Sequence, residues 1–235
     1  MSTGFNVYGQ QPDANNPLGN PPYPGATAAN GPVFIDFLTT TYNRSFLETY
    51  NLAFGGAMID NAVVASPFGL QVKSFSDQVN ELFLPHYVSN PGIPWVSNDT
   101  LFVVFMGIND AINTFMLPDT DGLQYRQVVE YERIVDQLYN AGARNFLFGH
   151  IPPIDRAPYM FPFSQSQRND LARWIASYIF RLHSLIWNFT RRYADVTAFE
   201  FDTNSLFLRV LADPSQFPET SGCRVVTDFC LAYER

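Results

Sequence analysis

Two glycine-containing motifs of this chain carry groups that can stabilise negative charge developing on an oxygen atom. Gly107-x-Asn109-Asp110 follows one apolar run, and Gly55-Gly56 follows another. A glycine exposes its backbone N–H, and an asparagine side chain supplies an NH2 donor, so the two motifs could provide oxyanion donors. The alternative is a plain strand-to-helix turn, in which Asn109 and Asp110 cap the next helix.

A hydrolytic site of this kind also needs a nucleophile and a general base. The candidate bases are the three histidines His86, His150 and His183. None completes an Asp-x-x-His pattern, because the residues three positions before them are Phe83, Leu147 and Phe180. His150 ends a predicted strand and is the best placed of the three. A structural role in the loop before Pro152 is nevertheless the favoured interpretation of His150, and His183 falls within a long predicted helix.

Alternating patterns predict the scaffold that positions these motifs. Apolar runs predict strands over 50–54, 101–106, 145–149 and 196–201. Helical spacing and stop signals predict helices over 32–42, 74–84 (ended by Pro85), 122–142 (ended near Gly142), 165–193 and 204–212. Ser164-x-x-Gln167 is typical of a capping box, and Leu171, Trp174, Tyr178, Leu182, Leu185 and Phe189 form the expected buried stripe of the long helix.

This alternation predicts a three-layer α/β sandwich with a mostly parallel sheet, in a single domain over 1–235. The proline- and glycine-rich residues 1–32 are expected to form a surface loop. We expect 101–106 to be the most buried strand, because its run is continuously apolar. Gly56 and Asn109 should lie on one edge of the sheet, since ligands bind beyond the carboxyl ends of parallel strands.

Composition narrows the functional classes. The chain has 235 residues, of which 46% are hydrophobic, and a formal net charge of −8. An acidic chain without a basic stripe is a poor candidate for binding nucleic acid or an anionic membrane. No run approaches the roughly 18 apolar residues of a membrane span. The first residues show no basic segment followed by an apolar one, so no signal peptide is predicted in this sequence.

The two cysteines and three sequons bear on the compartment. Cys223 and Cys230 could form a small disulfide or remain free thiols, depending on the compartment. Zinc is not expected, because neither a Cys-x-x-Cys spacing nor a histidine lies nearby. Asn43, Asn98 and Asn188 each begin an Asn-x-Ser/Thr sequon, which is compatible with glycosylation.

Several segments of the chain resemble the SGNH (GDSL-type) hydrolases, and in particular the fungal secreted acetyl esterases of carbohydrate esterase family sixteen. The similarity covers nearly the whole chain. It lies in Gly107-x-Asn-Asp, Gly4-Phe-Asn-Val, Asn16-Pro-Leu-Gly-Asn-Pro-Pro-Tyr-Pro-Gly25, Leu38-Thr-Thr-Thr-Tyr-Asn43, Asn51-Leu-Ala-Phe-Gly-Gly-Ala57 and Pro152-Pro-Ile-Asp-Arg-Ala-Pro158.

The resemblance implies that Gly56 and Asn109 are the catalytic oxyanion-hole donors, with Gly107 and Asp110 shaping their turn. It further implies secretion and removal of acetyl groups from plant cell-wall oligosaccharides, with no metal and no cofactor. The implied sheet is flavodoxin-like, with strand order 2-1-3-4-5. Its first strand, which would lie between 50–54 and 101–106, is missing from this sequence.

The chain departs from the family at its two remaining signature blocks. It contains neither a Gly-Asp-Ser nucleophile block nor an Asp-x-x-His block, and Ser2 is not flanked by Gly-Asp. We therefore expect an esterase scaffold incomplete at both termini and inactive as it stands. The alternative from another class is a non-catalytic carbohydrate-binding or interaction protein on the same scaffold.

Overall fold

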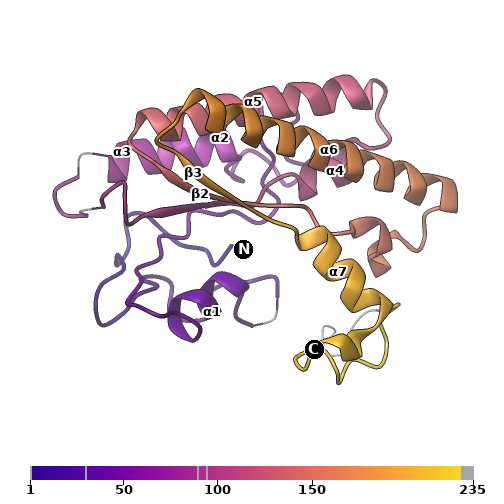
Figure 1. Cartoon of the computed structure of the whole chain (residues 1–235), viewed down its shortest axis with the longest axis horizontal. Helices are drawn as coiled ribbons and strands as arrows, with labels where there is room; N and C mark the ends of the chain where they lie inside the picture. Colours follow the sequence, from indigo (N-terminus) through magenta and orange to yellow (C-terminus); the bar gives the residue numbers. More distant parts are fainter. Residues whose placement is uncertain (1, 30, 89, 94, 229–235) are drawn as a thin grey trace. The chain divides into compact units, whose positions relative to one another are not determined.

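The computed structural model describes residues 2–29, 31–88, 90–93 and 95–228. Contacts within the chain divide it into two compact units, residues 1–94 and 95–235. Figure 1 colours both units along the sequence. The expectation of a single domain stays a prediction.

The second unit contains the sheet and the long helices. Its strands are β1 (Leu101–Val104), β2 (Asn145–Gly149) and β3 (Thr197–Phe201). Its helices are α4 (Ile108–Thr114), α5 (Thr120–Asn140), η2 (Ile154–Arg156), η3 (Pro158–Met160), α6 (Gln165–Arg192), α7 (Thr203–Ala212) and η4 (Pro214–Gln216). The strands pair in parallel in the order β1-β2-β3, with Leu101 opposite Asn145 and Asn145 opposite Thr197. The predicted α/β class with a parallel sheet is therefore confirmed.

The core of this unit lies between one face of the sheet and the helices α5 and α6. Phe146 and Phe148 of β2 are fully buried. The Phe146 ring meets Phe189 of α6 edge-on, with ring centroids 5.3 Å apart, and the Phe148 ring lies 6.2 Å from Tyr131 of α5. Figure 1 shows α5 and α6 over the same side of the sheet, with α7 leading away from the end of β3.

The expectation that 101–106 is the most buried strand is wrong. β2 has a neighbour on each side and is largely buried, whereas β1 ends at Val104 and its first residue, Leu101, is exposed. An apolar run is compatible with a central or a flanking strand, and pairing decides which of them is enclosed. β2 is therefore the centre of the sheet within the described residues.

The long helix follows its sequence signals closely. Ser164 caps it, with its hydroxyl accepting a hydrogen bond from the Gln167 N–H at 3.3 Å. All six residues of the predicted stripe are buried. The preceding helix, α5, ends before Gly142, whose φ of +111° is the left-handed conformation that closes helices.

The first unit is mostly irregular. Its helical segments are α1 (Phe34–Thr40), α2 (Phe75–Asp77), the π-helix η1 (Gln78–Phe83) and α3 (Leu84–Tyr87). The predicted strand 50–54 is wrong, because these residues form no regular secondary structure and pair with no strand among the described residues. The expectation of a loop over the first 32 residues is confirmed for those described, and the Asn20 side chain holds that loop through bonds to Asn6 and Gln10.

Pro85 does not end the helical segment that contains it. The π-helix closes with a bond from the Leu84 N–H to the Val79 carbonyl, and the α-helical register restarts at Leu84. Pro85 thus falls in the first turn of α3, where a proline needs no intrahelical N–H partner. The helical segment consequently extends to Tyr87.

Candidate functional site

The Gly107–Asp110 motif lies where β1 passes into α4. Gly107 is the N-cap of α4, with φ +109°, and the Ala111 N–H bonds to the Gly107 carbonyl at 2.9 Å. Asn109 and Asp110 occupy the second and third helical positions. Because the capping position is held by a glycine, the alternative in which Asn109 or Asp110 caps the helix is wrong.

Gly107 is required by a close neighbour as well as by its backbone conformation. A Cβ at this position would lie 2.6 Å from Cζ of Tyr178 on α6. The Tyr178 hydroxyl donates to the Met106 carbonyl at 3.1 Å. Burial raises the pKa of Tyr178 well above its usual value, and Tyr131 and Asp110 add to this effect. Tyr178 is therefore a neutral hydrogen-bond donor that fixes the turn preceding Asn109.

Asp110 anchors the same turn from the other side. Its carboxylate is fully buried and accepts a hydrogen bond of 2.9 Å from Nε2 of Gln127 on α5. Gln124, one turn earlier on α5, donates to the Trp174 carbonyl and accepts from the Ser177 hydroxyl, both on α6. These buried amides tie α4, α5 and α6 together, and they leave Asn109 on a rigid support.

Asn109 itself is half-buried. Its backbone carbonyl accepts a hydrogen bond of 2.7 Å from Nδ2 of Asn113. The position of Asn109 in the first turn of a helix suits an oxyanion donor, because the backbone N–H groups and the macrodipole there favour negative charge.

Gly56 occupies a tight turn of the first unit. Its φ is +80°, and a Cβ at this position would collide with the ring of Phe68. The Gly56 carbonyl accepts a hydrogen bond of 3.0 Å from the Ser66 hydroxyl. Within the described part of the chain, the Gly56 N–H donates to no backbone carbonyl. The turn thus holds a backbone donor in a conformation that a larger residue would strain.

Gly56 and Asn109 belong to different compact units. Their expected meeting at one edge of a sheet stays a prediction.

The three histidines have other partners. His150 follows β2, and its Nε2 and Nδ1 lie 3.0 Å from a Glu200 oxygen and 3.4 Å from an Asp202 oxygen. His183 Nδ1 lies 2.9 Å from the second Glu200 oxygen. The His86 ring packs edge-on against Tyr8, with centroids 4.9 Å apart. These contacts favour a structural role for His150, in which it joins the end of β2 to β3.

Tyr178 and Gln127 are positioning residues that the sequence did not reveal as such. The helical periodicity predicts that Tyr178 is buried, which the structure confirms, but it cannot show that the Tyr178 ring covers a glycine in another element. Gln127 falls on the buried side of α5 without any pattern that distinguishes it from a surface amide. The one signal in the sequence is Gly107, because a glycine can mark a place where another group comes close to the backbone. The sequence does not show which group that is.

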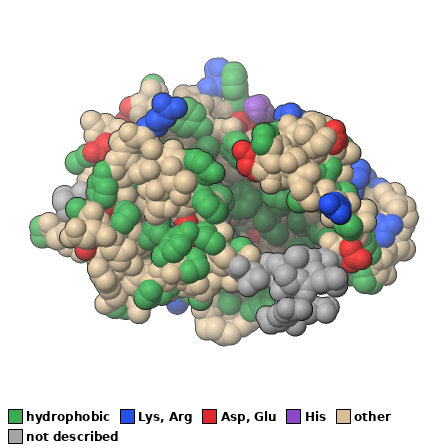
Figure 2. Space-filling model, turned by 90° about the horizontal axis from the view of Figure 1, so that it is seen from below, with side chains coloured by type: hydrophobic (Ala, Val, Ile, Leu, Met, Phe, Trp, Pro, Cys, Tyr) green, Lys and Arg blue, Asp and Glu red, His purple; other side chains and the backbone are tan. Residues whose placement is uncertain are grey.

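Among the described residues, no helix is long and apolar enough to cross a membrane, and no group of three or more His, Cys, Asp or Glu residues could hold a metal ion. On the face shown in Figure 2, Lys and Arg side chains are scattered rather than gathered into one patch. Cys223 is exposed, but Cys230 lies outside the described residues, so the disulfide stays a prediction.

Comparisons with known proteins agree with this architecture. The family model of GDSL-like lipases/acylhydrolases matches residues 3–211. An acetylesterase from Thermothelomyces thermophilus is 37% identical over 218 residues, which is 92% of this chain and 71% of that protein. A GDSL esterase/lipase from Arabidopsis thaliana is 25% identical over 78% of this chain and 56% of its own length. A second such plant protein is 27% identical over 61% of this chain and 42% of its own length. The chain therefore belongs to the GDSL (SGNH) lipase/acylhydrolase family.

Proposed function

We propose that this chain carries the greater part of an acetyl esterase, with the Gly56 N–H and the Asn109 side chain as oxyanion donors. The observation that carries the proposal is the rigid β1–α4 turn, in which Gly107, Tyr178 and Asp110 hold Asn109 in place. The 37% identity to an acetylesterase supports the acyl group. Acetylated plant cell-wall oligosaccharides are the substrates we propose, without a metal or cofactor.

The two donors would act on the tetrahedral intermediate of ester cleavage. Attack on the acetyl carbonyl turns its oxygen into an oxyanion, and preorganised N–H donors stabilise that charge more in the transition state than in the substrate. Removing one such donor typically slows turnover by about 10²–10³-fold. Glycine at position 56 keeps the N–H uncovered, and Asn109 contributes from a helix that cannot shift without breaking the Asp110–Gln127 bond.

The nucleophile and the base are not supplied by the sequence described. It contains no Gly-Asp-Ser and no Asp-x-x-His, and His150 is held by two carboxylates. We therefore propose that this chain by itself has negligible esterase activity. No serine of the chain should react with a fluorophosphonate probe.

A chimaera tests the proposal. The part of the Thermothelomyces acetylesterase that lies outside the matched 71% of its length would be fused to the corresponding end or ends of this chain. The chimaera should hydrolyse p-nitrophenyl acetate, whereas this chain alone should not. Asn109→Ala should lower the kcat of the chimaera by about 10²–10³-fold. Asn140→Ala, at an exposed asparagine of α5, is the matched control and should leave kcat unchanged.

Equal activity of the Asn109→Ala and Asn140→Ala chimaeras would refute the oxyanion assignment. Labelled Ser2, or activity of the chain alone that disappears on changing His150, would refute its inactivity. Calorimetric binding of acetylated xylo-oligosaccharides by a folded but inactive chimaera would instead favour the non-catalytic carbohydrate-binding alternative.

We also propose secretion and glycosylation. Asn43, Asn98 and Asn188, which begin the three sequons, are all exposed. Expression through a fungal secretory pathway should yield a product whose mass falls on treatment with an endoglycosidase. Replacing all three asparagines by glutamine should abolish that change, and an unchanged mass of the original product would contradict the proposal.

A further inference from the structure

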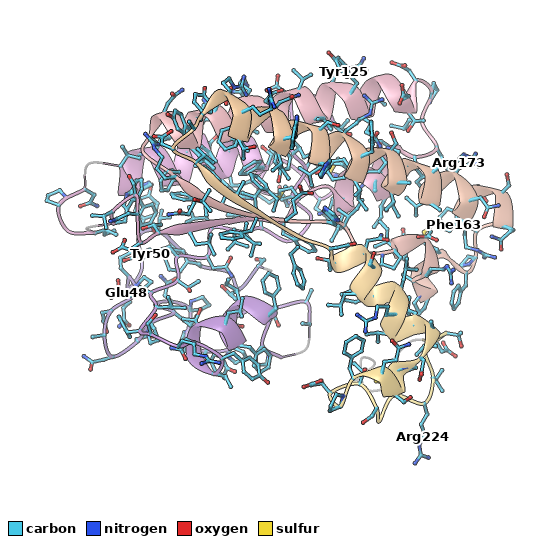
Figure 3. All side chains as sticks on the ribbon, in the orientation of Figure 1. Glu48, Tyr50, Tyr125, Phe163, Arg173 and Arg224 are labelled. Carbon is cyan, nitrogen blue, oxygen red and sulfur yellow. The ribbon has the colours of Figure 1, made fainter. Side chains whose placement is uncertain are left out.

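A pocket of about 530 Å³ lies in the second unit, where η2, the start of α6 and the end of α7 converge. Its volume falls within the range of small-molecule sites. The loop residue Phe163 and the α6 residue Arg173, both labelled in Figure 3, help to locate the start of this helix. None of the candidate esterase residues lines the pocket.

Two arginines line this pocket without a close carboxylate partner. Arg168 donates through Nη1 to the Phe163 carbonyl at 2.8 Å and through Nη2 to Oε1 of Gln165 at 2.7 Å. Among the described residues, no carboxylate lies within ion-pair distance of Arg168. Within the described part of the chain, the one carboxylate near Arg156 is that of Asp155, which lies 3.8 Å from the Arg156 Nε. The pocket therefore holds two guanidinium groups whose charge is incompletely balanced, in a chain that is acidic as a whole.

Arg168 is held in place before any ligand arrives. Its two hydrogen bonds join the loop that precedes α6 to the first turn of that helix. Gln165 in turn donates from Nε2 to Oδ1 of Asn169 at 2.8 Å. This chain of bonds leaves Nδ2 of Asn169 as a donor with no acceptor within the described residues. The first turns of α6 also contribute the positive end of the helix macrodipole.

The rest of the lining mixes acid and apolar groups. Asp155 is the acidic residue of the wall, and burial raises the pKa of its carboxyl group, which makes its negative charge costly there. Phe161 and Leu211 add apolar surface. A site that combines guanidinium groups, amide side chains and apolar patches suits a ligand with a carboxylate, hydroxyl groups and a C–H face.

We propose that this pocket binds a sugar acid, that is, a saccharide unit that bears a carboxylate. The carboxylate is held by Arg156 and Arg168, because a guanidinium matches the geometry of a carboxylate and stays charged. The hydroxyl groups are held by Gln165 and Asn169. The site goes beyond ester hydrolysis and does not depend on it, since it is measured by binding without turnover.

Isothermal titration calorimetry of the whole chain tests the site with three probes: D-glucuronate, D-glucose and acetate. Glucuronate should bind saturably, and glucose and acetate should each bind at least about tenfold more weakly. Glucose lacks the carboxylate that the arginines would hold, and acetate lacks the hydroxyl groups that the amide side chains would hold. Equal affinity for glucose would overturn the role of the arginines. Equal affinity for acetate would overturn the saccharide part, and no saturable binding of glucuronate would overturn the site.

Three variants assign the binding to the pocket. Arg156→Gln should weaken glucuronate binding by about tenfold or more, and the mostly exposed Arg156 side chain makes loss of folding an implausible cause. Asp155→Asn should tighten binding, because it removes the competing carboxylate. Arg173→Gln is the matched control, since Arg173 lies on α6 outside the pocket and pairs with Asp170. Equal effects of Arg156→Gln and Arg173→Gln, or weaker binding in Asp155→Asn, would overturn the proposal.

Discussion

Gly107→Ala should destabilise the chain through two separable effects. The backbone at this position has φ +109°, and forcing an L-residue into left-handed space costs about 1–2 kcal/mol. The new Cβ would also lie 2.6 Å from Cζ of Tyr178, and overpacking of this kind costs about 1–3 kcal/mol. Together the two effects should lower the free energy of unfolding by about 2–5 kcal/mol.

Thermal unfolding followed by circular dichroism measures this change. For a chain of this size, a loss of about 2–5 kcal/mol corresponds to a fall in Tm of about 4–20 °C. Gly222→Ala is the matched control, because Gly222 has no atom within 4 Å of an added Cβ and no left-handed φ. The control should unfold close to the temperature of the original chain.

A double-mutant cycle with Tyr178→Leu separates the two effects. If the ring contact contributes, Gly107→Ala should lower the free energy of unfolding by less in the Tyr178→Leu background. A loss of about 1–2 kcal/mol should remain there, because the backbone strain is unchanged. A Gly107→Ala variant as stable as Gly222→Ala would refute the geometry of the turn. Strict additivity in the cycle would refute the contact with Tyr178.

Three further outcomes follow from the structure. Asp110→Ala should lower the free energy of unfolding, measured by urea titration, by about 1–3 kcal/mol, because the buried Gln127 side chain loses its acceptor. A loss no larger than that of Asn140→Ala would contradict this prediction. Ser164→Ala should cost about 1 kcal/mol by removing the cap of α6, and unchanged urea midpoints would exclude that role. Burial raises the pKa of Tyr87 to about 12, with Tyr50 adding to the effect, whereas a tyrosine in the unfolded chain ionises near pH 10. The folded state binds this proton more tightly, so the contribution of Tyr87 to the free energy of unfolding should be fully present below pH 10 and be lost between pH 10 and 12. The free energy of unfolding should fall less steeply over this range in Tyr87→Phe, and identical pH profiles of the two proteins would contradict the assignment.

The sequence predicted the second unit well because its signals are local. The stripe of α6, the capping box at Ser164 and the stop at Gly142 each depend on a few neighbouring residues, and all three are confirmed. β2 and β3 were placed within a residue of their observed bounds, because their apolar runs are short and flanked by polar residues.

The failures concern pairing, which is not local. Residues 50–54 have an apolar pattern, but a strand needs a partner, and among the described residues none pairs with them. Which of β1 and β2 is the more buried strand likewise depends on neighbours that lie far along the chain. The sequence predicts a helix end at Pro85, but the π-helix before it shifts the hydrogen-bond register, and no residue preference predicts that shift.

The sequence points to Gly56 and Asn109 as donors, which stays a prediction, but it does not reveal the side chains that support the turn before Asn109. The sequence motif Gly107-x-Asn-Asp indicates possible hydrogen-bond donors for an oxyanion, and the turn lies after β1 as expected. Tyr178 and Gln127 approach this turn from helices that begin well after it, so their part could only be found in three dimensions.

The Glu200 carboxylate has a consequence for solubility. Among the described residues, β3 pairs with β2 alone, and its residues Phe199 and Phe201 are 54% and 52% exposed. A strand of this kind offers a template on which a second molecule can add a strand, and inward-pointing charges are one means by which natural sheets prevent that. Glu200 is the one charged residue of Thr197–Phe201, and it faces α6 through His183. Besides contacting two histidines, Glu200 is therefore an inward-pointing charge of the kind that disfavours the addition of a further strand.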